Sequence, residues 1–192
     1  DSPARGLPFG ENPRTGDARI SGSLASLVGL ESALDRGDEA AVEAAIRTIV
    51  LLHSVILSFG GIPLLYYGDA IGTLNSLEYL ADPQRAADNR WMHRSYFDWN
   101  KAKKRHESGT IEQRIFASLR KRIAVRKETA AFADFDNREL LAVDNPRLLV
   151  FSRGPVLVVV NFSTEAQSLP VDALRQRGHC LGETTNDLCT GD

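Results

Sequence analysis

The spacing of hydrophobic and polar positions predicts three helices in the first two thirds of the chain. The first covers residues 23–34 and ends near Gly37, where glycine permits a left-handed C-terminal cap. The second begins after Asp38, its N-cap, and ends at Gly60. Its apolar stripe consists of Val42, Ile46, Ile49, His53 and Ile56. One face of this helix is therefore expected to be buried, and we interpret His53 as a core histidine rather than a ligand or a catalyst.

The third predicted helix begins at Thr110, and Gln113 completes a capping box in its first turn. Its buried stripe is expected to consist of Ile111, Ile115, Leu119 and Ile123, and its solvated cations of Arg114, Lys121, Arg122 and Arg126. A nearly continuous apolar run, residues 62–67, lies between the second and third helices. Such a run is typical of a strand that is buried on both faces of a parallel sheet.

The rest of the chain lacks the helical period. Residues 1–19 are rich in glycine and proline and are expected to form a loop. Residues 69–108 also show little periodicity, and so long a loop in a compact domain usually has a function. A period of two predicts short strands at 138–143, 148–153 and 156–162, with 167–171 as a candidate for one more. This change of period places a domain boundary near Asp134.

Composition narrows the classes of function. With 43% hydrophobic and 25% charged residues, the 192-residue chain resembles an ordinary globular protein. A net charge of −2 argues against a nucleic-acid partner, and we interpret the basic run at 101–105 as a solvated loop. No membrane partner is expected, because the most apolar stretch, residues 49–56, is interrupted by His53 and Ser54.

Neither a cofactor nor a metal site is expected, since no phosphate-binding loop or metal-ligand spacing occurs. Cys180 and Cys189 are compatible with a disulfide or with two free thiols. The sequence begins at Asp1 without an initiator methionine, so we expect it to be part of a longer protein, either in the bacterial cytoplasm or secreted.

Glycoside cleavage needs two carboxyl groups on either side of one bond, one of them held protonated by its surroundings. The candidates near the pocket that we expect after the apolar run are Asp69, Glu78, Asp82 and Asp88. Their sequence context suggests no raised pKa, so no catalytic residue is assigned. Asp69 follows the apolar run and is interpreted as support for a pocket, binding backbone N–H groups.

Arg90 is the strongest candidate for binding a hydroxylated ligand. It stands between Asn89 and Trp91, with His93 close behind. A guanidinium can bond the vicinal hydroxyls of a sugar or fix a facing carboxylate, and the alternative is an ordinary salt bridge within the loop. We interpret Trp91 and His93 as support for this pocket, although core packing is the commoner role of a single tryptophan.

These residues resemble the amylosucrase and sucrose hydrolase branch of the α-amylase superfamily. The similarity is carried by residues 5–22, by Gly-Asp-x-x-Gly-Thr-Leu-Asn at 68–75 and by Arg-Trp-x-His-Arg at 90–94. It implies an α/β plus β fold: the C-terminal part of a (β/α)₈ TIM barrel over residues 1–134, followed by an incomplete antiparallel β-sandwich over 135–192. One departure is Ala70, which stands where the family usually has glutamate.

The resemblance also implies an activity. Such enzymes cleave sucrose through a covalent glucosyl intermediate and pass the glucosyl unit to an α-glucan or to water. Their three catalytic carboxylates lie upstream of the region that this chain resembles. Arg90 would close the glucose subsite by pairing with an aspartate early in the barrel, and Arg19 would contact the acceptor. The expected partners are sucrose, α-glucans and the missing N-terminal part of the enzyme; the alternative is a non-catalytic carbohydrate-binding or scaffolding module.

Overall fold

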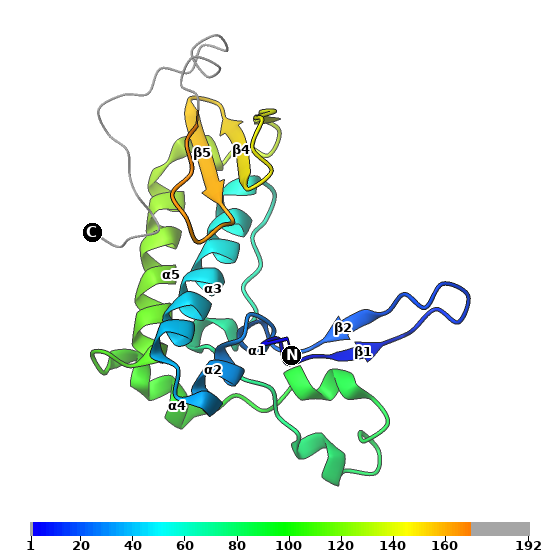
Figure 1. The fold of residues 1–192 in the computed structure, drawn as a ribbon. Helices are drawn as coiled ribbons and strands as arrows, with labels where there is room; N and C mark the ends of the chain where they lie inside the picture. The colour runs from blue at the N-terminus through cyan, green and yellow to red at the C-terminus, as the bar shows by residue number, and fades with distance from the viewer. Residues whose placement is uncertain (1, 170–192) are drawn as a thin grey trace. The chain divides into compact units, whose positions relative to one another are not determined.

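The computed structural model of the protein describes residues 2–169, and Figure 1 shows the arrangement of the chain in space, with labels on all of the following helices and strands except β3. The helices are α1 (Leu24–Leu27), α2 (Leu30–Arg36), α3 (Glu39–Phe59), α4 (Trp99–Lys103) and α5 (Ile111–Glu128). The strands are β1 (Leu7–Phe9), β2 (Arg19–Ser21), β3 (Arg138–Leu140), β4 (Leu148–Arg153) and β5 (Val156–Asn161). They form two antiparallel sheets, one of β1 and β2 and one in the order β3-β4-β5.

The predicted TIM barrel with a following β-sandwich is wrong. The described residues contain no parallel strand pair, and only two small antiparallel sheets. Residues 62–67, expected to be a buried strand, are irregular and carry two highly exposed side chains, Ile62 and Leu64. A buried parallel strand needs a neighbour on each edge to bind its backbone groups, and no described strand pairs with this run.

The chain divides into two compact units. Unit 1 consists of the described parts of Asp1–Val50 and Leu65–Leu119, and unit 2 of those of Leu51–Leu64 and Arg120–Asp192. Each unit therefore contains part of α3 and part of α5. The core of unit 1 consists of Ala25, Leu30, Ala45, Ile46, Ile49, Ile115 and Leu119.

The helix caps follow the sequence. The Asp38 carboxylate accepts a hydrogen bond from the Ala41 backbone N–H (3.0 Å), and the Thr110 hydroxyl accepts one from Gln113 N–H (3.2 Å), as predicted. The single helix expected at 23–34 is two helices, because Gly29 adopts a positive φ of 92° between α1 and α2. Glycine tolerates this left-handed conformation, which no right-handed helix can continue through.

The core face of α3 was predicted correctly at His53, which is 1% exposed. The same helix is long and apolar enough to cross a membrane by length and composition alone, contrary to our expectation. His53 and Ser54 are polar, but they do not lower the mean hydropathy of the helix enough to exclude it. Core helices of globular domains also meet this criterion, and Ile46 and Ile49 of α3 are buried against α5 residues in unit 1.

Unit 2 is built on the β3-β4-β5 meander, in which Arg153 pairs with Val156 across a tight turn at Gly154. Arg122, expected to be solvated, is buried instead. Its Nε donates to the Ser54 hydroxyl (2.8 Å), so a polar position on α3 provides a partner for the cation. Residues 167–169 are irregular, and the remainder of the proposed strand at 167–171 lies outside the described residues, as do Cys180 and Cys189.

Three arginines of unit 2 bind the backbone carbonyls at the end of α3. Arg126 donates to the carbonyls of Leu57 (2.5 Å) and Gly61 (3.1 Å). Arg138 donates to Phe59 O (2.9 Å), and Arg153 to Ser58 O (2.5 Å). The last carbonyls of a helix have no partner within the helix, so these guanidinium groups provide the missing hydrogen bonds. Their positive charges are also attracted to the negative end of the helix dipole.

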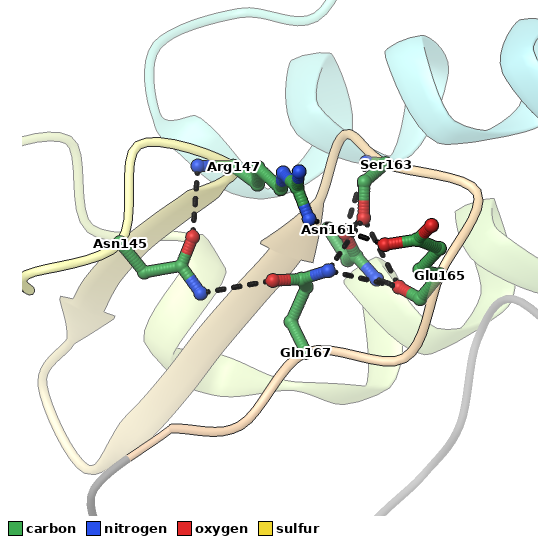
Figure 2. A network of polar contacts seen from close by, with 6 residues as sticks. All are labelled: Asn145, Arg147, Asn161, Ser163, Glu165 and Gln167. Atoms are coloured by element: carbon green, nitrogen blue, oxygen red, sulfur yellow. Dashed lines mark hydrogen bonds and ion pairs between the residues drawn. The ribbon is translucent and has the colours of Figure 1, made fainter.

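A separate polar network joins the loop before β4 to the loop after β5 (Figure 2). Asn145 donates to Gln167 (3.1 Å), Arg147 pairs with Glu165 (3.2 Å), and the Asn161 amide oxygen accepts from the hydroxyl of Ser163 (2.8 Å). Within the loop after β5, Gln167 Nε2 also donates to the Ser163 hydroxyl (3.0 Å). We therefore interpret this network as a structural tie rather than as a ligand site.

Candidate functional site

All five residues that the sequence places in a sugar pocket lie in unit 1. Arg19 is on β2, directly opposite Phe9 of β1 in the antiparallel pair. Arg90, Trp91 and His93 belong to a short 3₁₀ helix, Asn89–His93, whose N-cap Asp88 accepts a hydrogen bond from Arg90 N–H. Asp69 begins another 3₁₀ turn, Asp69–Ile71.

The two predicted substrate-binding arginines meet on one aromatic ring. The Arg90 Cζ lies 4.4 Å and the Arg19 Cζ 5.4 Å from the centroid of Phe9. Asn89 holds the 3₁₀ helix against β1, because its Nδ2 donates to Pro8 O (2.7 Å). Asn89 Oδ1 is buried, with no hydrogen-bond partner in the part of the chain that the structure describes. We name Phe9, Arg19, Asn89 and Arg90 the arginine–phenylalanine site.

Arg90 is paired within its own loop. Its Nε donates to Asp88 Oδ1 (2.8 Å) and its Nη2 to Asp88 Oδ2 (2.7 Å), which is a two-pronged contact. These hydrogen bonds lower the pKa of Asp88 from 3.8 to about 2. The structure thus contains the local salt bridge that we gave as the alternative, and it leaves the Nη1 donors of Arg90 without a hydrogen bond to any described residue.

Asp69 and His93 come together elsewhere. They line a small hollow with Ser23, Tyr66, Tyr67, Gly68 and Thr73. The space inside it that can hold water is about 10 Å³, roughly enough for one water molecule and far too little for a hexose. His93 Nδ1 is buried there without a hydrogen-bond partner among residues 2–169, and burial lowers the pKa of this histidine. Burial thus disfavours the charged form of His93, and its role as support for a sugar pocket stays a prediction.

One face of the Trp91 ring is covered by the guanidinium group of Arg85. The Arg85 Cζ lies 4.5 Å from the centre of its ring, and Arg85 also pairs with Asp82 (3.1 Å). The face of Trp91 that Arg85 covers cannot stack on a ligand. Arg90 lowers the pKa of Asp88, so this carboxyl is a poor candidate for a group that must be held protonated. Among the described residues, no group of three or more His, Cys, Asp and Glu side chains could hold a metal ion.

Phe9 was not among our candidates, although it lies within the motif that carries the family resemblance. Its role depends on its contacts with Arg19 and Arg90, which lie farther along the chain, and no local sequence pattern predicts these contacts. No protein-family model matches the chain. The resemblance therefore rests on the motifs themselves, and the activity that it implies is a proposal.

Proposed function

We propose that this chain is part of a sucrose-cleaving, α-retaining glucosyltransferase or hydrolase of the amylosucrase type. It would supply sugar-binding residues, while catalytic carboxylates come from another part of the enzyme. The glucosyl unit would pass to an α-glucan or to water. The motifs around Gly68 and Arg90 support the family, and the pairing of Asp82 and Asp88 with arginines agrees with carboxylates being supplied from elsewhere.

The observation that carries the proposal is the convergence of Arg19 and Arg90 on Phe9. The two guanidinium groups lie over the Phe9 ring, which holds them close together, and they offer several N–H donors to the hydroxyls of a sugar. Asp88 fixes the plane of Arg90 through two hydrogen bonds, so little side-chain freedom remains to be lost when a ligand binds.

The test is titration calorimetry of sucrose into the whole chain. We expect weak binding that Arg19→Ala or Arg90→Ala weakens by roughly tenfold, which corresponds to about 1.4 kcal/mol. Arg147→Ala is the matched control, because that arginine is exposed and forms its ion pair in unit 2. The chain alone should release neither glucose nor fructose. Equal binding by all three variants, or no binding by the wild type, would refute the proposal.

The pairing of Arg90 with Asp88 and the one-water hollow beside Asp69 favour the alternative, a non-catalytic carbohydrate-binding module. In that case no subsite needs to enclose a glucosyl unit. The two functions differ in the longer protein that we expect to contain this chain. Sucrose cleavage that Arg90→Ala reduces would identify the enzyme, and saccharide binding without any cleavage would identify the module.

A further inference from the structure

Unit 2 contains an apolar hollow of about 460 Å³ at the end of α3. Its described lining consists of apolar side chains and glycine, among them Phe59, Gly60, Ile62 and Leu140. Ile62 is 88% and Leu140 59% exposed, so this lining faces solvent. Sites that bind small molecules have volumes of roughly 300–1,000 Å³. The hollow is therefore large enough to hold an aliphatic chain.

Arg138 lies at the rim of this hollow. Side chains alternate along a strand, so Arg138 and Leu140 share one face of β3, while Glu139 is on the other. The Arg138 Cζ lies 4.0 Å from the centroid of the Phe59 ring, and a Cβ added at Gly60 would lie 3.1 Å from Arg138 Nη1. The guanidinium group thus lies against two residues of the lining, and the glycine leaves room for it.

The guanidinium group of Arg138 is held in place but has unused donors. Its Nη1 donates to Phe59 O (2.9 Å), and it forms no ion pair with a carboxylate of residues 2–169. Its Nε and Nη2 have no hydrogen-bond partner in that part of the chain either. These nitrogens carry parallel N–H groups, the same pair with which Arg90 binds both oxygens of Asp88. Arg138 can bind a carboxylate in the same way.

The electrostatic potential at this end of α3 is positive. Burial, followed by the charges of Arg126 and Arg138, lowers the pKa of Arg153, so the three guanidinium groups are close enough to repel one another. Asp134 opposes this effect, and the end of a helix adds only about −0.5 of a charge. Three full positive charges outweigh both, which favours an anion at the rim.

We propose that the apolar hollow of unit 2 binds a free aliphatic carboxylate of the medium-chain fatty acid type. The hydrocarbon chain lies in the hollow, and the carboxylate binds Nε and Nη2 of Arg138. Anionic membrane surfaces are recognised instead by clusters of exposed basic residues, and here Arg126 and Arg153 bind backbone carbonyls. The inference goes beyond the proposed function, because it makes no use of the arginine–phenylalanine site.

The experiment measures binding of decanoate and of decanol to the whole chain by titration calorimetry. The protein concentration is one at which sedimentation velocity shows a monomer. Decanoate should bind at least tenfold more tightly than decanol, which has the same chain but no charge. Octanoate should bind more weakly than decanoate, by roughly fourfold for each of the two methylenes that it lacks.

Two pairs of variants separate the rim from the lining. Arg138→Gln should weaken decanoate binding about tenfold and leave decanol binding unchanged, whereas Arg147→Gln, at an exposed arginine of unit 2, should change neither. Leu140→Ser should weaken binding of both ligands, and Leu77→Ser, at a leucine of unit 1 that is 61% exposed, should weaken neither. Circular dichroism melting curves check that each variant is folded. The preference for decanoate over decanol is measured on the wild type and depends on no variant.

Absence of decanoate binding, or equal affinity for decanoate and decanol, would overturn the inference. So would an unchanged decanoate affinity in Arg138→Gln. A dimer that Leu140→Ser abolishes and saturating decanoate leaves intact would assign the hollow to a second copy of the chain and contradict the inference. Binding to phosphatidylglycerol vesicles without affinity for free decanoate would assign it to a membrane surface, with the same consequence.

Discussion

At the scale of single residues, charge pairing decides which sequence candidates can act on a ligand. Asp88 was considered as a catalytic carboxylate, but its two hydrogen bonds with Arg90 lower its pKa to about 2, the opposite of what a general acid needs. This pair is separated by one residue, so it could have been predicted from the sequence. The meeting of Arg90 with Phe9 could not, because it joins segments about eighty positions apart in the chain.

We expect the Asp88 carboxyl to titrate with a pKa near 2, well below its ordinary value of 3.8. Because the folded-state pKa is lowered, the stability that the ion pair contributes is present above about pH 4. It is lost as the pH falls from about 4 toward 2. The measurement is a carboxyl-carbon NMR titration, in which Arg90→Ala should return the midpoint to nearly 4. A midpoint that is the same in both proteins would contradict the ion pair.

At the scale of elements, the two long helices α3 and α5 were predicted correctly, whereas the parallel strand predicted at 62–67 is absent from the structure. Helical period and caps are local, so Asp38 and Thr110 mark the starts of α3 and α5 correctly. A strand exists only if another strand pairs with it, and the apolar composition of residues 62–67 contains no information about that neighbour. The strands of the meander were predicted because hairpin partners follow each other directly in the chain.

We expect the buried side chain of Arg153 to stabilise the packing of the meander against the end of α3. Its side chain is 0% exposed and donates to Ser58 O, Asn137 Oδ1 (2.6 Å) and Asp134 O. Arg153→Ala leaves these acceptors without a partner, so the free energy of unfolding should fall by roughly 3 kcal/mol. Arg153→Lys should recover little of it, because one ammonium cannot replace a guanidinium that binds several acceptors.

Urea denaturation measures this effect. Arg147→Ala is again the control, since an exposed ion pair contributes about 0–1 kcal/mol. If Arg153→Ala were no more destabilised than Arg147→Ala, the contacts of Arg153 with α3 would not stabilise the fold.

At the scale of the whole molecule, the exposed apolar surface is the dominant feature. Ile62 is 88% and Leu64 81% exposed. In unit 2, an apolar hollow of about 460 Å³ is lined by Val55, Ile56, Phe59, Gly60, Ile62, Pro63, Leu140 and Leu149. Surfaces of this kind promote association between copies of a chain.

We therefore expect the isolated chain to self-associate as its concentration rises. Replacing Ile62 and Leu64 together by lysine should shift the population toward the monomer, whereas lysine at the exposed position Arg47 on α3 should change nothing. Sedimentation velocity over a range of concentrations measures the distribution. A wild-type chain that stays a monodisperse monomer would refute this prediction.

The arginines at the end of α3 have a consequence for the order of folding. Arg126, Arg138 and Arg153 come from α5, β3 and β4, all of which are synthesised after α3. The last turn of α3 thus receives one capping partner from α5 and two from strands of the meander, so its capping is complete only once the meander has assembled. During refolding, the amides in the final turn of α3 should therefore become protected from hydrogen exchange together with those of β4. They should become protected later than the amides in the first turns of the same helix.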